Sequence, residues 1–174
     1  MGKILGSWSG MRKYLEQEML AESLKGRVRY GCTTYPGMDG SHVFELCIDG
    51  QQVKRFSWET VNSYFIDTGL SSQPKNYYWE NFLPLLEGIS VSERDAHTDD
   101  EFCEALTVYR AQEIQKSLSS ENPLVRMFAV LDRRVGKRSL EKLKETLPNQ
   151  PAWLRDIYGL RLCAEGIPSK GVDA

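Results

Sequence analysis

The stretch HVFELCIDGQQVKRFS limits the possible folds more than any other part of the chain. Phe44, Leu46 and Ile48 alternate with the residues between them, as in a strand that buries one face. Asp49-Gly50 then separates two strand-like runs, and this dipeptide supplies the positive φ angles of a type I′ turn. The stretch therefore predicts a β-hairpin with a two-residue loop.

The residues on either side of the hairpin predict a small mixed lobe. RVRYGCTTY alternates in the same way and predicts a further strand before the hairpin. Ser57 is placed to cap a short helix after it. A stripe at i, i+3, i+7 and i+11 predicts an N-terminal helix; its members are Trp8, Met11, Leu15 and Met19. We expect an α-β-β-β-α lobe over residues 1–70.

The second half of the chain carries helix signals and no strand pattern. A polar segment, 68–76, precedes it, and Thr98 with Glu101 forms a capping box. Asn122-Pro123 starts another helix with proline at its preferred first position. Its apolar stripe, Leu124, Phe128, Leu131 and Val135, predicts that this helix ends at Gly136, and further helices follow Ser139 and Pro151.

The expected fold class is therefore α+β. An N-terminal helix, a three-stranded antiparallel sheet with a hairpin and a short helix precede a C-terminal bundle of four to five helices, a helical lobe over residues 77–168. A chain of 174 residues suffices for one compact unit built from both lobes.

Composition excludes several classes of protein. The net charge is −2, so no overall field attracts nucleic acid or a membrane surface. No apolar run is long enough to span a bilayer, and the first residues lack a secretory pattern. The four cysteines have no CxxC spacing and predict reduced thiols; they are Cys32, Cys47, Cys103 and Cys163. We expect a cytoplasmic protein that does not enter a membrane.

No catalytic motif is present in the sequence. The two histidines, His42 and His97, have no GxSxG elbow to complete a triad, and phosphate-binding glycine loops are missing. One cluster has atoms that can bind metals: His97, Asp100, Cys103 and Glu104. Acidic residues in the first turn of a capped helix explain this cluster better. We expect no catalytic residue, metal or cofactor, and an enzyme with an unrecognised site is the third alternative.

The stretch LDRRVGKRSLEKLK holds the densest group of cations, Arg133, Arg134, Lys137 and Arg138. One interpretation places them at the carbonyl end of a helix, where cations are favourable. The other is a basic elbow between two helices that docks an acidic protein surface or phosphate. Residues 87–113 hold eight acids and two bases, net −6, and residues 119–145 hold seven bases and four acids, net +3. Neighbouring helices of opposite charge could also satisfy each other.

An aromatic run offers a second possible partner-binding surface. Its members are Tyr77, Tyr78, Trp79 and Phe82. Large aromatic residues more often anchor one element onto another, because they dominate burial energetics. Together with the four cations of the elbow, these residues make up the predicted partner-binding set.

Nucleic-acid binding is the alternative function. It would use Arg27, Arg29 and Lys54 of the sheet together with the four cations of the elbow. The α-β-β-β-α order resembles that of double-stranded-RNA-binding domains, but in order only. Those domains open their last helix with lysines, whereas Glu59 stands at that place here.

Three stretches carry a wider resemblance: SWSGMRKYLEQ with LKGRVRY, LCIDGQQV, and NPLVRMFAVLDRRVGKRSLEKLK. Together they resemble a family of small bacterial proteins of unknown function over nearly the whole chain. The resemblance implies a bacterial cytoplasmic protein and assigns no site residue. We therefore expect a non-enzymatic interaction or regulatory module that binds a protein partner, with no oligomeric state indicated.

Overall fold

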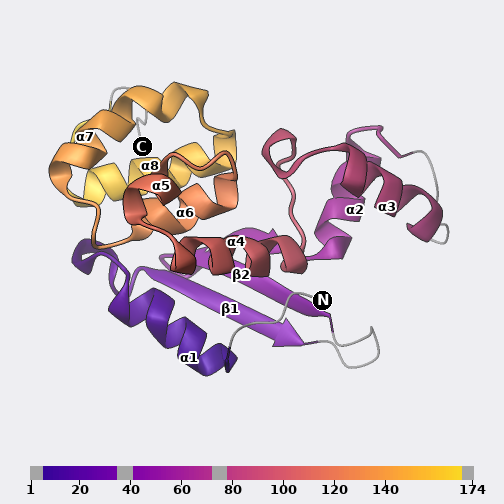
Figure 1. Cartoon of the computed structure of the whole chain (residues 1–174), viewed down its shortest axis with the longest axis horizontal. Coiled ribbons are helices and arrows are strands. Elements are labelled where there is room, and N and C mark those ends of the chain that lie inside the picture. The colour runs from indigo at the N-terminus through magenta and orange to yellow at the C-terminus, as the bar shows by residue number, and fades with distance from the viewer. Residues whose placement is uncertain (1–5, 35–40, 72–77, 170–174) are drawn as a thin grey trace.

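The computed structural model describes residues 6–34, 41–71 and 78–169, with the backbone alone at 78–80. A helical N-terminus leads into one sheet, and helices follow it (Figure 1). The elements are α1 (Trp8–Lys13), the π-helical turn η1 (Tyr14–Glu18), η2 (Glu22–Leu24), β1 (Val28–Thr34), β2 (His42–Ile48), β3 (Gln51–Phe56), α2 (Trp58–Asp67), α3 (Tyr78–Gly88), η4 (Val91–Glu93), α4 (Asp99–Ala111), α5 (Ile114–Leu118), α6 (Pro123–Leu131), α7 (Lys137–Thr146), η5 (Leu147–Asn149) and α8 (Ala152–Ala164). The expected α+β class is confirmed.

The sheet is antiparallel with strand order β1-β2-β3, and the predicted hairpin joins β2 to β3. Asp49 and Gly50 have φ angles of 51° and 81°, as a type I′ turn requires. The Arg27 guanidinium forms two hydrogen bonds of 2.9 Å with the Asp49 carboxylate beside the turn. The turn that the sequence predicts is therefore present, and a side chain of the neighbouring strand holds it.

A β-bulge interrupts the pairing of β2 with β3. Leu46 pairs with Lys54 while Cys47 pairs with Gln52, so Val53 is the additional residue. A bulge shifts the alternation of side chains by one. Val53 is consequently 47% exposed, and Lys54 points into the molecule and is 8% exposed.

The hydrophobic core lies on one face of the sheet, under α4 and α6. The Phe102 ring of α4 lies 4.4 Å from Phe44, 4.9 Å from Phe56 and 5.3 Å from Phe128, measured between ring centroids. Trp8 of α1 reaches the same Phe44 ring at 5.2 Å. The core therefore joins residues from both predicted lobes.

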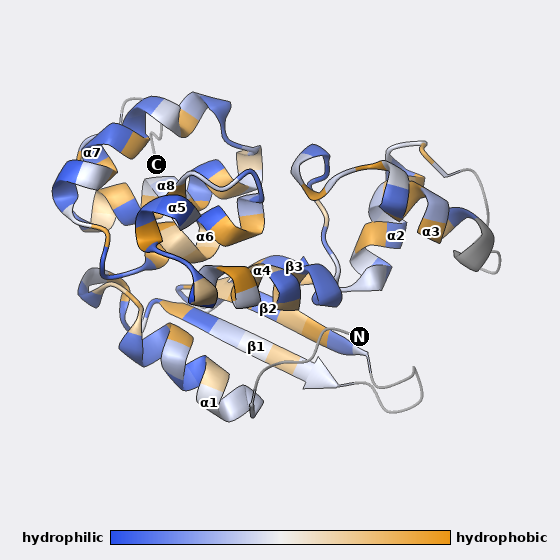
Figure 2. Cartoon of the chain, in the orientation of Figure 1, coloured by the Kyte–Doolittle hydropathy of each residue, from blue (hydrophilic) through white to orange (hydrophobic). Residues whose placement is uncertain are grey.

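The C-terminal helices are arranged around α6, which is buried except at Arg126. α7 covers it with a mainly hydrophilic helix, as Figure 2 shows. The predicted extension of α6 to Gly136 is wrong: α6 ends at Leu131, and Gly136 is the N-cap of α7. Val135 continues the apolar stripe, but it reaches the core from the connecting turn.

Other segments occupy the two outer strands of the sheet. The Glu16 carboxylate accepts a 2.7 Å hydrogen bond from the backbone amide of Tyr30 in β1. Phe56, at the end of β3, forms a parallel bridge with His97. The sheet therefore ends in side-chain and backbone contacts on both sides.

Helices α2 and α3 form an arm that stands apart from the C-terminal helices (Figure 1). They share a small apolar cluster that is separate from the main core and consists of Val61, Phe65, Phe82 and Ala96. We call α2 and α3 the α2–α3 arm. Among the described residues, no helix has the length and apolar character needed to cross a membrane.

Candidate functional site

The basic elbow, Arg133, Arg134, Lys137 and Arg138, lies at the connection between α6 and α7. All four residues are exposed. The backbone here is bound to the segment before β1: Ala21 N donates to Leu131 O at 2.9 Å, and Arg133 N donates to Met19 O at 2.7 Å. The connection is therefore a fixed turn and not a loose loop.

Asp132 organises the elbow from beneath. Its side chain is fully buried and accepts hydrogen bonds from the Tyr109 hydroxyl at 2.5 Å and from the Arg134 amide at 2.7 Å. The Arg134 guanidinium contacts both carboxylate oxygens, with Nη2 at 2.7 Å. Hydrogen bonding to Asp132 raises the pKa of Arg134, and burial followed by Asp132 raises the pKa of Tyr109. Arg134 is therefore held in one orientation before any ligand binds.

A second buried side chain supports the other end of the turn. Arg161 of α8 donates from Nη2 to Val135 O at 2.9 Å, and burial lowers its pKa. Its Nη1 lies 3.4 Å from the Glu165 carboxylate, an ion-pair distance without good hydrogen-bond geometry. Ser23 donates to the same carboxylate at 2.7 Å. The elbow is thus fixed by α8 as well as by α4.

The surface next to the elbow combines arginine with tyrosine. The Arg110 guanidinium lies 5.1 Å from the centre of the Tyr14 ring, and that of Arg134 lies 5.9 Å from the centre of the Tyr109 ring. Burial raises the pKa of Tyr14, while Arg134 and Arg110 oppose the increase. Tyrosine and arginine are the side chains that protein interfaces enrich.

The cations of the elbow do not lie where the favourable interpretation places them. Arg133 and Arg134 follow the end of α6, and Lys137 and Arg138 form the first turn of α7. The first turn of a helix is the positive end of its dipole, so cations there are unfavourable. α7 has no acidic residue in this turn and no side-chain N-cap. Across the described residues, Arg133, Lys137 and Arg138 form no ion pair with an acidic side chain.

The structure separates the residues of the nucleic-acid alternative. Arg29 is exposed on β1, but Arg27 is engaged by Asp49. Lys54 is wrongly placed on that surface, because the bulge at Val53 turns its side chain into the interior. The sheet and the elbow therefore do not present the expected joint set of cations.

The aromatic set is divided too. Phe82 is 3% exposed and packs in the cluster of the α2–α3 arm, so it belongs to the core and not to a surface. Tyr77 lies outside the described residues, and so do the side chains of Tyr78 and Trp79 in the first turn of α3. The elbow is the part of the predicted partner-binding set that the structure brings together.

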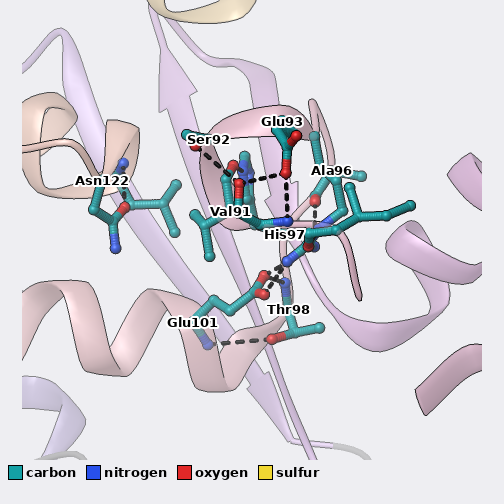
Figure 3. A network of polar contacts seen from close by, with 12 residues as sticks. Val91, Ser92, Glu93, Ala96, His97, Thr98, Glu101 and Asn122 are labelled. Atoms are coloured by element: carbon teal, nitrogen blue, oxygen red, sulfur yellow. Dashed lines mark hydrogen bonds and ion pairs between the residues drawn. The ribbon is translucent and has the colours of Figure 1, made fainter. Parts of the chain in front are cut away.

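A buried polar junction lies between the main core and the α2–α3 arm (Figure 3). The predicted capping box is present: Glu101 N donates to the Thr98 hydroxyl, and Thr98 N donates to Glu101. Glu101 also binds Arg94, whose guanidinium donates to Ala96 O at 3.0 Å. Arg94 is 1% exposed, so its charge is neutralised inside the protein.

Lys54 and His97 belong to the same junction. The Lys54 ammonium donates to Asp95 O at 2.7 Å and lies 3.9 Å from the centre of the Trp153 ring. Burial lowers the pKa of Lys54 to about 7. Burial, with the neighbouring Lys54 charge, lowers the pKa of His97 to about 3, and its Nε2 bonds to Val91 O at 2.9 Å. No sequence signal identifies this junction, because its members come from three separate elements.

The other predicted cluster does not assemble into a metal site. Burial raises the pKa of Cys103 to about 12, so its thiol stays protonated, and His97 is engaged by Val91. Within the described parts of the chain, no three histidine, cysteine or acidic side chains meet in a metal-binding arrangement. All four cysteines are free thiols.

A protein-family model, the SF0329 protein family, matches residues 7–162. The match covers the sheet, the arm and the C-terminal helices, and it confirms the whole-chain resemblance seen in the sequence. No curated protein and no solved structure matches the chain at a significant level. Any functional assignment must therefore come from the residues themselves.

Proposed function

We propose that this chain, which belongs to the SF0329 protein family, is a non-enzymatic bacterial protein of the cytoplasm that binds an acidic surface of a partner protein through the basic elbow. One observation carries the proposal. Lys137 and Arg138 lie in the first turn of α7, against the helix dipole and without an acidic partner among the described residues. A local rule broken without compensation inside the fold points to a role outside it. The four free thiols support a reducing compartment.

Preorganisation supports binding at this site. Asp132, Arg161 and the backbone bridge to Met19 hold the turn, so few degrees of freedom are lost when a ligand binds. Arg134 presents a fixed guanidinium, which suits a carboxylate better than a flexible ammonium does.

The charge distribution favours a protein partner over nucleic acid. Proteins that bind duplexes strongly neutralise roughly six to ten phosphates. The elbow offers four exposed cations, one of them bound to Asp132, while Lys54 is buried and Arg27 is paired. Four cations suit a local acidic patch such as a group of aspartates or glutamates.

The test compares two double variants with the same change in net charge. Lys137→Glu with Arg138→Glu alters the elbow, and Lys116→Glu with Arg155→Glu alters exposed cations elsewhere. Both proteins are used to capture partners from a nuclease-treated bacterial lysate, and each captured protein is then purified and titrated. We expect a partner that binds the wild type and the control variant and binds the elbow variant at least about tenfold more weakly.

Stability separates a binding role from a structural one. Because the cations oppose the helix dipole, the elbow variant should unfold at a higher temperature, with roughly 0.3–1 kcal/mol gained per residue. An elbow variant that melts below the wild type would show that these cations stabilise the fold, and the proposal would be wrong. It would also be wrong if both variants captured the same proteins with equal affinity.

The nucleic-acid alternative is tested directly with labelled duplex DNA and RNA by fluorescence anisotropy. We expect weak binding that disappears near physiological salt for all three proteins. Submicromolar wild-type binding at that salt, lost in the elbow variant alone, would establish the alternative.

A further inference from the structure

The α2–α3 arm is attached to the body of the protein through a polar layer. Its apolar cluster does not merge with the main core. Between the two lie buried polar and charged side chains: Lys54, Ser57, Arg94, His97 and Thr98. Apolar surfaces that meet directly resist separation, whereas a polar layer can exchange its partners for water at lower cost. This layer is therefore the natural place for the arm to separate.

The chain enters and leaves the arm at one place. Phe56 pairs with His97 in a parallel bridge, and Ser57 N donates to His97 O at 3.1 Å. α2 begins directly after Ser57, and α3 leads back through η4 to His97. Adjacent entry and exit points are the geometry of a hinge, because two short segments absorb the whole movement.

We propose that the α2–α3 arm swings about this hinge and is held closed by a latch in which Lys54 grips the Asp95 carbonyl and the Trp153 ring. The latch joins β3, the segment after η4 and the start of α8. The pivot is the beginning of α4, where Arg94 and the capping box remain bound to Glu101. The inference does not rest on the basic elbow, which lies at the other end of α4.

The groups that face Lys54 make the latch sensitive to protons. Asp95 and Glu101 attract its ammonium, while the neutral ring of His97 lies beside it. Burial outweighs the two carboxylates and lowers the pKa of Lys54 to about 7, compared with about 10.5 in water. The closed arm therefore prefers the neutral amine, and the open arm prefers the ammonium. Acid opens the arm and base closes it.

Two unpaired polar atoms show that the closed junction is only partly satisfied. His97 Nε2 must donate to the Val91 carbonyl, so Nδ1 is a buried acceptor without a partner among the described residues. Trp153 Nε1 is a buried donor, also without a partner in that part of the chain. Each gains a hydrogen bond when the arm opens, which offsets part of the cost of opening.

The test measures hydrogen exchange by mass spectrometry at about pH 6 and about pH 8, each corrected for the intrinsic rate of exchange. Peptides from α2 and α3 should be protected less than peptides from α4 and α6. From the two pKa values of Lys54, the opening constant of the arm should be about tenfold larger at the lower pH. His97, if it is also hydrated, adds roughly fourfold.

Lys54→Met keeps the length of the side chain and removes the titration. It should lower the ratio of the two opening constants by about tenfold, whereas Lys116→Met, on the surface of α5, should leave it unchanged. If Lys54→Met does not fold, Lys54→Gln decides in its place. Equal protection of arm and body, or a ratio unaffected by the substitution of Lys54, would overturn the proposal.

Discussion

Removing the buried charge of Lys54 should stabilise the protein, and by an amount that depends on pH. The unfolded chain binds a proton at Lys54 below about pH 10.5, and the folded protein does so only below about 7. Between these values the unfolded state binds more protons, so the stability of the wild type rises with pH. Lys54→Met has no such group, and its advantage over the wild type should therefore shrink as the pH rises.

The size of the effect follows from the two pKa values. The difference in unfolding free energy between Lys54→Met and the wild type should fall by about 3 kcal/mol from pH 6 to pH 9.5. Loss of the contact with Trp153 and of the hydrogen bond to Asp95 changes stability by an amount that does not depend on pH. It therefore shifts the whole curve and leaves the slope intact.

Urea unfolding of both proteins at four or five pH values measures this slope, and all titrations that the two proteins share cancel in the difference. Lys116→Met provides the control, because Lys116 is exposed on α5 and its substitution should shift stability by no more than roughly 0.5 kcal/mol at any pH. A free-energy difference that stays constant across the range would show that Lys54 titrates normally, and the reasoning from burial would fail.

Three further predictions concern the fold. Asp132→Asn should lower the free energy of unfolding by about 2–3 kcal/mol, because it leaves buried donors opposite a neutral amide, and Tyr109→Phe by about 1 kcal/mol; equal melts of Asp132→Asn and wild type would contradict the role of Asp132. The fragments 1–72 and 73–174 should not melt cooperatively on their own, because Phe44 and Phe102 pack in one core from the two halves; two independent cooperative transitions in calorimetry would refute this. Thr98→Ala should cost about 1 kcal/mol through loss of the capping box, measured by urea unfolding against Ser92→Ala, an exposed control that should be nearly neutral.

Features written into neighbouring residues could be predicted from the sequence. The Asp49-Gly50 turn and the Thr98–Glu101 capping box each depend on residues within three positions of one another. Both are therefore visible in a short window, and both are present. Proline at the first position of α6 belongs to the same group.

The candidate site could be predicted only in part, for two physical reasons. One extra residue at Val53 reverses the faces of β3, and no local pattern announces a bulge, so Lys54 was assigned to the wrong side. Val135 keeps the helical spacing of α6 although α6 ends four residues earlier, so the cations seemed to lie at a helix C-terminus. Burial of Asp132 depends on Tyr109 and the Met19–Ala21 segment, which are distant in the sequence.

The contacts on the outer strands decide how this sheet can meet other molecules. An unpaired strand edge invites another chain to add a strand, which is the usual route to edge-to-edge aggregation. Here the Glu16 carboxylate occupies an amide on the free side of β1, and His97 pairs with the end of β3 beyond the bulge. Across the described residues both edges are thus interrupted, and β-strand addition finds no continuous ladder. Recognition is left to side chains, and the fold is protected against the self-association to which small exposed sheets are prone.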